Sequence, residues 1–212
     1  MIRIFLVDDH RILREGLRAL LDLQSDMQVV GEAEDGRAAL RGIFSVKPDL
    51  VLMDITIPEL NGIDAARSAL EKLPNLKIII LSVHSDSEHI YHAMQAGAKG
   101  YLLKESAGEE VVHAIRAVSQ NQIYQSKKIT EALTPAHSRL RETRSPFETL
   151  SQREREVLQL TVEGATSAAI ADKLALSPKT VETYRSRLME KLGVQNLPEL
   201  VRLAIKHGLT PM

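Results

Sequence analysis

Two hydrophobic patterns alternate along the first 120 residues of the chain. Short apolar runs predict buried strands, and the segments between them, such as 11–23, place apolar residues at helical spacing. Five strands are expected, at 2–7, 28–33, 50–54, 77–82 and 100–103. Strands that alternate with amphipathic helices are typical of βαβ units, so the pattern predicts an α/β fold with a doubly wound, five-stranded parallel sheet.

The pattern changes after residue 120. The segment 121–146 is rich in Ser, Thr, Arg and Pro, and we expect it to be a linker with a short helix around 128–133. Four compact helical segments follow within 147–212. The chain is therefore predicted to have two domains, an α/β domain at 1–120 and an all-α domain at 147–212.

Helix starts in the second domain are marked by capping residues. Ser151 and Asn196 are each followed three residues later by Glu, and Ser177 precedes a proline. Residues 166–192 then read as a helix, a turn and a helix. The final helical segment has an apolar stripe at helical spacing, made of Leu197, Leu200, Val201, Ala204 and Ile205.

Polar side chains stand where four of the predicted strands end. They are Asp8 and Asp9 after the first strand, Asp54, Ser82, and Lys104 after the fifth. Because parallel strands point the same way, their carboxyl ends meet at one edge of the sheet, where open α/β folds bind ligands. We therefore expect these five side chains to be neighbours.

This set of groups is suited to phosphoryl transfer. Carboxylates close together repel one another unless a cation neutralises them, and Mg²⁺ prefers such oxygen ligands. Asp54 stands alone in the middle of the edge, where a carboxylate can act as a nucleophile and form an acyl phosphate. Lys104 and Ser82 would then bind the phosphoryl oxygens. A single Asp, Ser or Lys at a strand end is usually a turn or solvated residue, so the prediction depends on their co-occurrence.

The second helix of the 166–192 segment presents a polar face. Its outward residues are Lys179, Glu182, Thr183, Ser186, Arg187 and Glu190. Such a helix can lie in a DNA major groove, with Lys and Arg on phosphates, short polar side chains at base edges, and Glu182 accepting from cytosine. The alternative is a small helical bundle with a charged solvent face.

The composition of the chain limits the kinds of site and the cellular location that can be expected. The 212 residues are 44% hydrophobic and include no cysteine, which excludes disulfides and Cys-ligated zinc and fits a reducing compartment. The net charge of −1 is the sum of −5 in 1–120, +3 in 121–146 and +1 in 147–212, which favours separate units. A secretory signal and a membrane span are not expected, so we predict a cytoplasmic protein.

Four motifs together resemble the receiver domain of bacterial two-component response regulators, over about residues 1–120. They are VDDH at 7–10, MDITIPELNG at 53–62, LSVHS at 81–85 and AGAKGYLLK at 96–104. The resemblance implies a flavodoxin-like fold in which Asp54 accepts phosphate from a phosphohistidine on a sensor histidine kinase.

The same resemblance implies roles for other residues of this domain. Asp9, Asp54 and the backbone carbonyl of Thr56 would bind Mg²⁺, with Asp8 helping through water. Ser82 and Lys104 would bind the phosphoryl group, and Tyr101 would change rotamer with phosphorylation. Thr56 and His84 occupy positions that tune dephosphorylation in the family.

Two further motifs are similar to the LuxR-type helix-turn-helix of the NarL/FixJ subfamily, over about 147–210. They are LSQREREVLQLTVEG at 150–164 and IADKLALSPKTVETYRSRLMEKLGV at 170–194. The similarity places Glu182, Thr183 and Ser186 nearest the bases and Lys179, Thr180 and Arg187 nearest the phosphates. It also implies a homodimer in the active state, for which the outward side of the last helix, with Leu203, is the candidate interface. The alternative for this apolar stripe is packing in the core of its own domain.

This chain departs from the subfamily before the first helix of the motif. Ser167, Ala168 and Ala169 stand where an Asn-Lys-Glu type stretch is usual, so a phosphate contact and a surface ion pair are expected to be missing.

We therefore predict a phosphorylation-dependent, DNA-binding transcriptional regulator and not an enzyme. One alternative is a Mg²⁺-dependent phosphohydrolase of the haloacid dehalogenase type, but Thr56 stands where such enzymes have a second Asp. Another is a DNA-binding regulator whose receiver domain is never phosphorylated and serves only for dimerisation. The complete acidic pocket with Ser82 and Lys104 argues against this second alternative.

Overall fold

The computed structural model of the chain describes residues 1–126, 129 and 145–209. The chain folds into two compact units, the first within residues 1–126 and the second comprising mainly residues 145–209. Most of the predicted linker, 121–146, lies outside the described residues, as does the helix predicted at 128–133 except for residue 129. No helix within the described part of the chain has the length and apolar character needed to cross a membrane.

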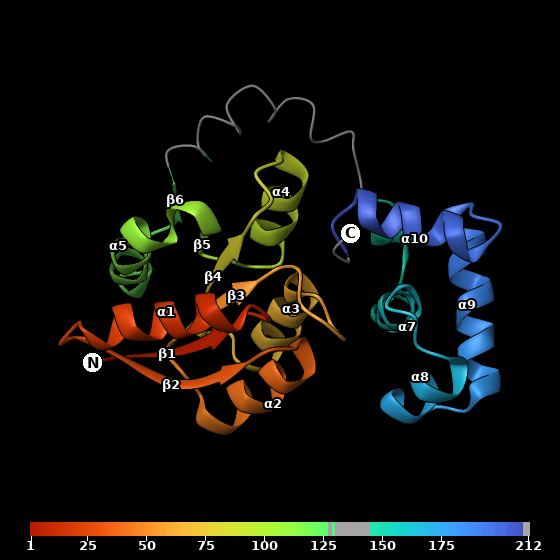
Figure 1. Cartoon of the computed structure of the whole chain (residues 1–212), viewed down its shortest axis with the longest axis horizontal. Coiled ribbons are helices and arrows are strands. Elements are labelled where there is room, and N and C mark those ends of the chain that lie inside the picture. Colours follow the sequence, from red (N-terminus) through yellow and green to blue (C-terminus); the bar gives the residue numbers. More distant parts are fainter. Residues whose placement is uncertain (127–128, 130–144, 210–212) are drawn as a thin grey trace. The chain divides into compact units, whose positions relative to one another are not determined.

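Parallel strands form the sheet of the N-terminal unit, in the order β2-β1-β3-β4-β5-β6 (Figure 1). Their bounds are β1 Ile2–Val7, β2 Met27–Ala33, β3 Leu50–Asp54, β4 Lys77–Ser82, β5 Gly100–Leu103 and β6 Tyr124–Gln125. The five predicted strands are confirmed, but the predicted number is corrected to six. The additional strand β6 has only two residues and no apolar run, and its place comes from pairing with Gly100 and Tyr101 of β5.

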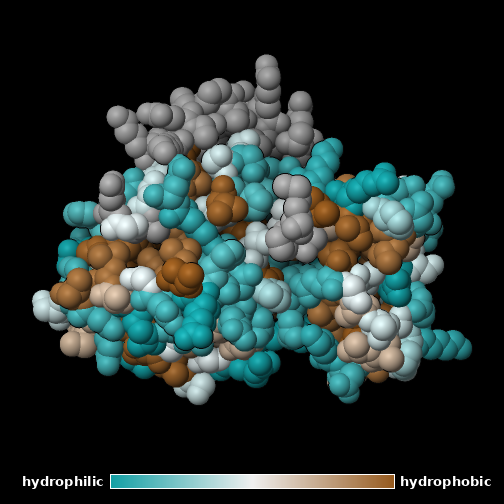
Figure 2. Space-filling view, in the orientation of Figure 1, coloured by the Kyte–Doolittle hydropathy of each residue, from teal (hydrophilic) through white to brown (hydrophobic). Residues whose placement is uncertain are grey.

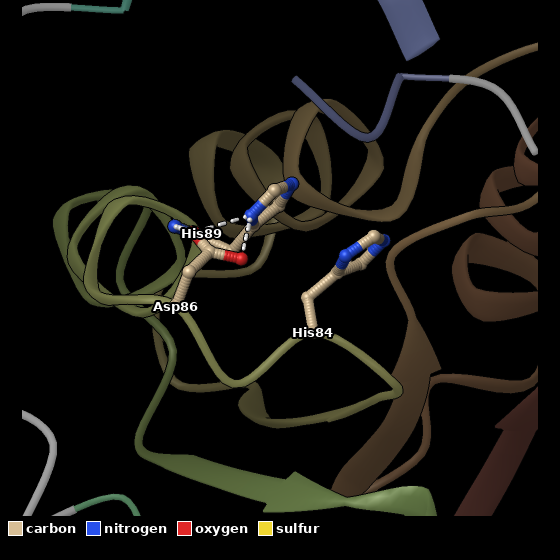
Figure 3. Close-up of side chains that lie close together, drawn as sticks. All are labelled: His84, Asp86 and His89. Atoms are coloured by element: carbon tan, nitrogen blue, oxygen red, sulfur yellow. Dashed lines mark hydrogen bonds and ion pairs between the residues drawn. The ribbon is translucent and has the colours of Figure 1, made fainter. Parts of the chain in front are cut away.

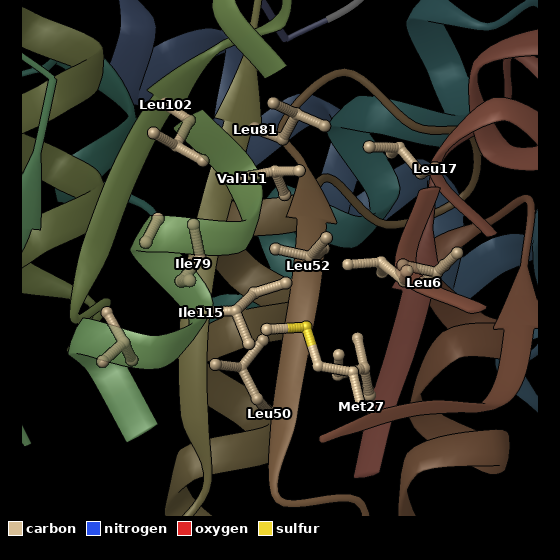
Figure 4. Close-up of a cluster of buried hydrophobic side chains, with 14 of the residues drawn as sticks. Leu6, Leu17, Met27, Leu50, Leu52, Ile79, Leu81, Leu102, Val111 and Ile115 are labelled. Atoms are coloured by element: carbon tan, nitrogen blue, oxygen red, sulfur yellow. The ribbon is translucent and has the colours of Figure 1, made fainter. Parts of the chain in front are cut away.

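Helices cover both faces of this sheet, as the doubly wound fold requires. They are α1 Arg11–Asp22, α2 Gly36–Val46, α3 Gly62–Lys72, α4 Ser87–Gln95 and α5 Ala107–Ser119, with a 3₁₀ turn at Lys104–Ser106. Leu6 and Leu52 of the strands share a buried cluster with Leu17 of α1 and Ile115 of α5 (Figure 4). Phe5 points to the opposite face, where its ring meets Gly42 of α2.

Local signals explain where the helices begin and end. Asp35, Asn61 and Asp86 cap α2, α3 and α4 by accepting hydrogen bonds from backbone N–H groups three residues ahead. Gly97 follows the end of α4 with φ of +100°, a conformation that glycine adopts at little cost.

The C-terminal unit is helical, as predicted. A 3₁₀ turn at Pro146–Thr149 precedes α7 Gln152–Val162, α8 Ser167–Leu174, α9 Pro178–Leu192 and α10 Leu197–Lys206. The capping box of Ser151 and Glu154 is present, and Ser177 caps α9. Ile170 and Leu174 of α8 are buried in one core with Val181 and Leu188 of α9, so α8 and α9 form the predicted helix-turn-helix.

The face seen in Figure 2 is largely hydrophilic, with hydrophobic patches between the polar side chains. Large apolar residues that remain exposed include Ile12, Val83 and Leu197.

Candidate functional site

The carboxyl ends of β1, β3 and β5 bring two acidic side chains and one basic side chain into contact. Nζ of Lys104 lies 2.8 Å from Oδ2 of Asp8 and 2.8 Å from Oδ2 of Asp54. Both carboxylates are buried, each only 2% exposed. The structure therefore brings together three of the five strand-end groups in direct ion pairs.

Negative charge exceeds positive charge in this pocket. Burial raises the pKa of Asp54 to about 6, and the charge of Asp8 adds to the rise, whereas Lys104 and the backbone N–H of Thr56 oppose it. Burial alone would lower the pKa of Lys104, but Asp54 and Asp8 outweigh burial and raise it. One half-buried cation thus faces two buried carboxylates, so a further cation would stabilise the ionised site.

Asp9 and His10 extend the pocket towards solvent. Nδ1 of His10 lies 2.8 Å from Oδ1 of Asp9 and 3.2 Å from Oδ1 of Asp8. Asp8, Asp9, His10 and Asp54 each offer one ligand atom, and these atoms lie within 4.8 Å of one another. The carboxylate oxygens and the excess negative charge fit Mg²⁺. His10 was not among the predicted site residues, although its position directly after two acids was a usable signal.

Ser82 and Tyr101 both form hydrogen bonds with the backbone of His84, in the loop after β4. Oγ of Ser82, at the buried end of β4, accepts a hydrogen bond from the backbone N–H of His84 (3.1 Å). Tyr101 is fully buried, and its hydroxyl donates to the backbone carbonyl of His84 (2.8 Å). Oγ1 of Thr56 and Nε2 of His84 lie 3.3 Å apart. The loop after β4 therefore connects the phosphoryl-binding candidates to Tyr101.

The position of Asp54 is set by close packing between the backbones of β3 and α3. Gly62, the first residue of α3, lies so near β3 that a Cβ atom added to it would be 1.9 Å from the carbonyl oxygen of Asp54. Only glycine fits at this position, because the obstacle is backbone and not a mobile side chain.

We predict that Gly62→Ala moves Asp54 and lowers the free energy of unfolding by roughly 1–3 kcal/mol, as overpacking does. Urea unfolding measures this loss. Gly16→Ala is the matched control, because a Cβ atom there meets nothing within 4 Å. That helical substitution is expected to raise stability by about 0.5–1 kcal/mol. Equal effects of the two substitutions would show that the contact with Asp54 is unimportant.

The outward face of α9 carries all the residues predicted to meet DNA. Lys179, Glu182, Thr183, Ser186 and Arg187 are exposed, and Thr180 is half-buried. A shallow hollow on this face is lined by Ser177, Lys179, Thr180, Thr183, Tyr184 and Arg187. Short polar and basic side chains are therefore available along one side of the helix.

Glu182 is held by two neighbours. The hydroxyl of Ser167, the first residue of α8, donates to the Glu182 carboxylate. Arg185 donates to the Ser167 hydroxyl (3.0 Å) and lies 3.5 Å from Glu182. An interaction across the two helices is therefore present at the position where the sequence predicted a missing ion pair. The role of Arg185 was not predicted, although its spacing of three residues from Glu182 on a helix was a usable signal.

Comparison with known protein families divides the chain in the same way. Residues 4–116 match the response regulator receiver domain, and residues 148–204 match the luxR family of bacterial regulatory proteins.

Individual relatives match over almost their whole length. The chain is 40% identical over 209 residues to the response regulator UvrY of Escherichia coli (strain K12), covering 99% of this chain and 96% of UvrY. It is 39% identical over 209 residues to the response regulator GacA of Pseudomonas aeruginosa, covering 99% of this chain and 98% of GacA.

Solved structures are similar over both units. The response regulator ChrA of a heme-sensing two-component system is 33% identical, with 98% of each chain covered and a TM-score of 0.54. RcsB in a complex with DNA is 26% identical, with 95% of this chain and 96% of RcsB covered and a TM-score of 0.61.

Proposed function

Because this chain belongs to the NarL/FixJ subfamily of response regulators, which join a receiver domain to a LuxR-type DNA-binding domain, we propose that phosphorylation of Asp54 controls its binding to DNA. The observation that supports this most is the contact of Lys104 with both Asp8 and Asp54, at 2.8 Å each. The phosphate donor is a sensor histidine kinase. Transfer of labelled phosphate to the wild type and to Asp54→Asn tests the assignment.

In the proposed reaction, an oxygen of Asp54 attacks the phosphorus of a phosphohistidine. The P–N bond breaks and an acyl phosphate forms. Lys104 offsets the charge on the phosphoryl oxygens, and the Ser82 hydroxyl donates a hydrogen bond to one of them. Asp8, Asp9, Asp54 and the backbone carbonyl of Thr56 would hold Mg²⁺, which when bound neutralises charge on the transferring group.

The phosphoryl group is read out through the loop after β4. In the structure, Oγ of Ser82 accepts a hydrogen bond from the backbone N–H of His84. The backbone carbonyl of His84 accepts a hydrogen bond from the Tyr101 hydroxyl. Movement of Ser82 towards the phosphoryl group disturbs this loop, so Tyr101 loses its partner and changes rotamer. A near-complete change of state requires about 5.5 kcal/mol of differential stabilisation. New contacts of the phosphoryl group with Lys104 and Ser82 would supply part of it.

The C-terminal unit binds the DNA in this proposal, with α9 in the major groove. Glu182, Thr183 and Ser186 meet base edges, and Lys179, Thr180 and Arg187 meet phosphates. One similar structure is of two RcsB dimers bound to two parallel DNAs, and we propose that this chain is also a homodimer when active. Leu203 is half-buried and packs on the core of its own unit, whereas Leu197 of the same helix is 42% exposed, which adds Leu197 to the candidate interface.

Two substitutions on α9 separate base reading from phosphate binding. Glu182→Gln is expected to remove a preference at one base pair, worth about 1–3 kcal/mol, because the amide can also donate. Lys179→Ala is expected to weaken all sequences alike and to reduce the salt dependence of binding by about one phosphate contact. Selection from a randomised DNA pool and titrations at several salt concentrations measure the two effects. A uniform loss of affinity in Glu182→Gln would contradict base reading.

A further inference from the structure

A second group of metal-binding side chains lies just beyond the phosphorylation site. His84 is in the loop after β4, Asp86 caps α4, and His89 is in the first turn of that helix. Each offers one ligand atom, and these three atoms lie within 4.8 Å of one another. Nothing in the proposed phosphorylation chemistry uses Asp86 or His89.

The three side chains are already arranged around one another. Nδ1 of His89 lies 2.7 Å from both carboxylate oxygens of Asp86 (Figure 3). The rings of His84 and His89 stack with centroids 4.2 Å apart and planes inclined by 7°. Ligand atoms bound to one tetrahedral zinc ion at about 2 Å are about 3.3 Å apart. Because the nitrogen lone pairs of two stacked imidazoles lie in parallel planes, one ring must turn out of the stack before both face the same ion.

Helix capping explains only part of this arrangement. Oδ1 of Asp86 accepts from the backbone N–H of His89 (3.1 Å), which is the capping bond of α4. That bond needs no imidazole at position 84 or 89. Oδ2 of Asp86 is not used by the cap; it lies 2.7 Å from Nδ1 of His89, and an ion that replaces the proton between them leaves the cap in place.

The position of the group gives an ion access from solvent. The Asp86 side chain is 52% exposed, and that of His89 is 10% exposed. Although burial raises the pKa of Asp86, its hydrogen bonds to His89 outweigh burial and lower the pKa to about 2. The carboxylate is therefore ionised at neutral pH and can serve as a ligand.

We infer that His84, Asp86 and His89 form a binding site for a divalent transition-metal ion, of which Zn²⁺ fits best. Two imidazoles and one carboxylate, with water in the fourth position, are a common ligand set for zinc. The hard ion Mg²⁺ prefers oxygen ligands, so the acidic pocket and this site select different metals. An ion held by Nδ1 of His89 and the Asp86 carboxylate takes the place of the proton that they share.

Metal binding here would also bear on the receiver domain. An ion fixes His84, whose backbone carbonyl accepts the hydrogen bond of Tyr101 (2.8 Å). We therefore expect metal binding and the movement of Tyr101 to be coupled. The site itself does not depend on phosphorylation of Asp54, so it can be tested alone.

Titration of the full-length protein with Co²⁺, a spectroscopic substitute for Zn²⁺, tests the site. Excess Mg²⁺ is present to occupy the acidic pocket. The wild type is expected to bind one Co²⁺ ion and to develop the visible absorption of a tetrahedral N/O site, which Zn²⁺ then removes by competition. His84→Gln, His89→Gln and Asp86→Asn are each expected to weaken binding about tenfold or more. Asp86→Asn retains a capping side chain, and therefore separates loss of a ligand from loss of the helix start.

Two histidine substitutions serve as controls. His92→Gln lies one turn further along α4, and His10→Gln lies at the acidic pocket; both are expected to bind Co²⁺ as the wild type does. Absence of the absorption band in the wild type would overturn the inference. So would wild-type affinity in His89→Gln and His84→Gln, or loss of binding in His10→Gln instead.

Discussion

Asp54→Asn is expected to abolish phosphate uptake by the protein. An amide lacks the nucleophilic oxygen needed for the acyl phosphate, while Lys104 and Ser82 bind phosphoryl oxygens but cannot replace the nucleophile. The protein is incubated with a labelled phosphorylated kinase and Mg²⁺, and the label on the regulator is measured after denaturing electrophoresis.

Asp49→Asn is the matched control for this substitution. Asp49 is exposed and immediately precedes β3, the strand that Asp54 ends. The control is expected to take up phosphate as the wild type does. Label retained by Asp54→Asn would place the phosphoacceptor elsewhere. Continuous release of phosphate from a small ester by the wild type would instead favour the phosphohydrolase alternative.

Lys104→Ala is expected to lower the free energy of unfolding by about 3–5 kcal/mol at neutral pH in buffer without Mg²⁺. The substitution leaves Asp8 and Asp54 buried together without the cation that lies 2.8 Å from each of them. Lys99→Ala is the matched control. Lys99 is exposed and precedes β5, which Lys104 follows, so a change within about 0.5 kcal/mol is expected.

The loss in Lys104→Ala should depend on pH. The pKa of Asp54 in the folded protein is raised from 3.8 to about 6, mainly by burial. Ionisation of Asp54 therefore reduces stability as pH rises between these two values. Without Lys104 the folded-state pKa rises further, so the difference between variant and wild type is expected to grow from about pH 5 to about pH 8. Urea unfolding at both pH values measures this difference in the free energy of unfolding. A difference that shrinks with rising pH would contradict a stabilising role of the ion pairs of Lys104.

The strand ends were predictable because the strands are continuous apolar runs. Each run in β1, β3, β4 and β5 stops at a polar residue, and parallel topology alone then brings Asp8, Asp54 and Lys104 to one edge. The helix starts at Ser151 and Ser177 were predictable for a similar reason, since capping is local chemistry.

Features that depend on tertiary contacts were not predictable in this way. The two residues of β6 become a strand only by pairing with β5. The bond from Tyr101 to the carbonyl of His84 depends on how the loop after β4 folds, and the stacking of His84 on His89 depends on the same loop. The contact of Ser167 with Glu182 requires the crossing of α8 and α9, which periodicity does not specify.

Control of DNA binding by Asp54 is tested most directly by the affinity of the full-length protein for its selected DNA site, with and without beryllofluoride and Mg²⁺. Beryllofluoride on the Asp54 carboxylate stands in for the phosphoryl group. We predict that the wild type binds about tenfold or more tightly with beryllofluoride, and that Asp54→Asn does not respond. Equal affinity of the wild type under both conditions would contradict phosphorylation control and favour a receiver domain that serves only for dimerisation.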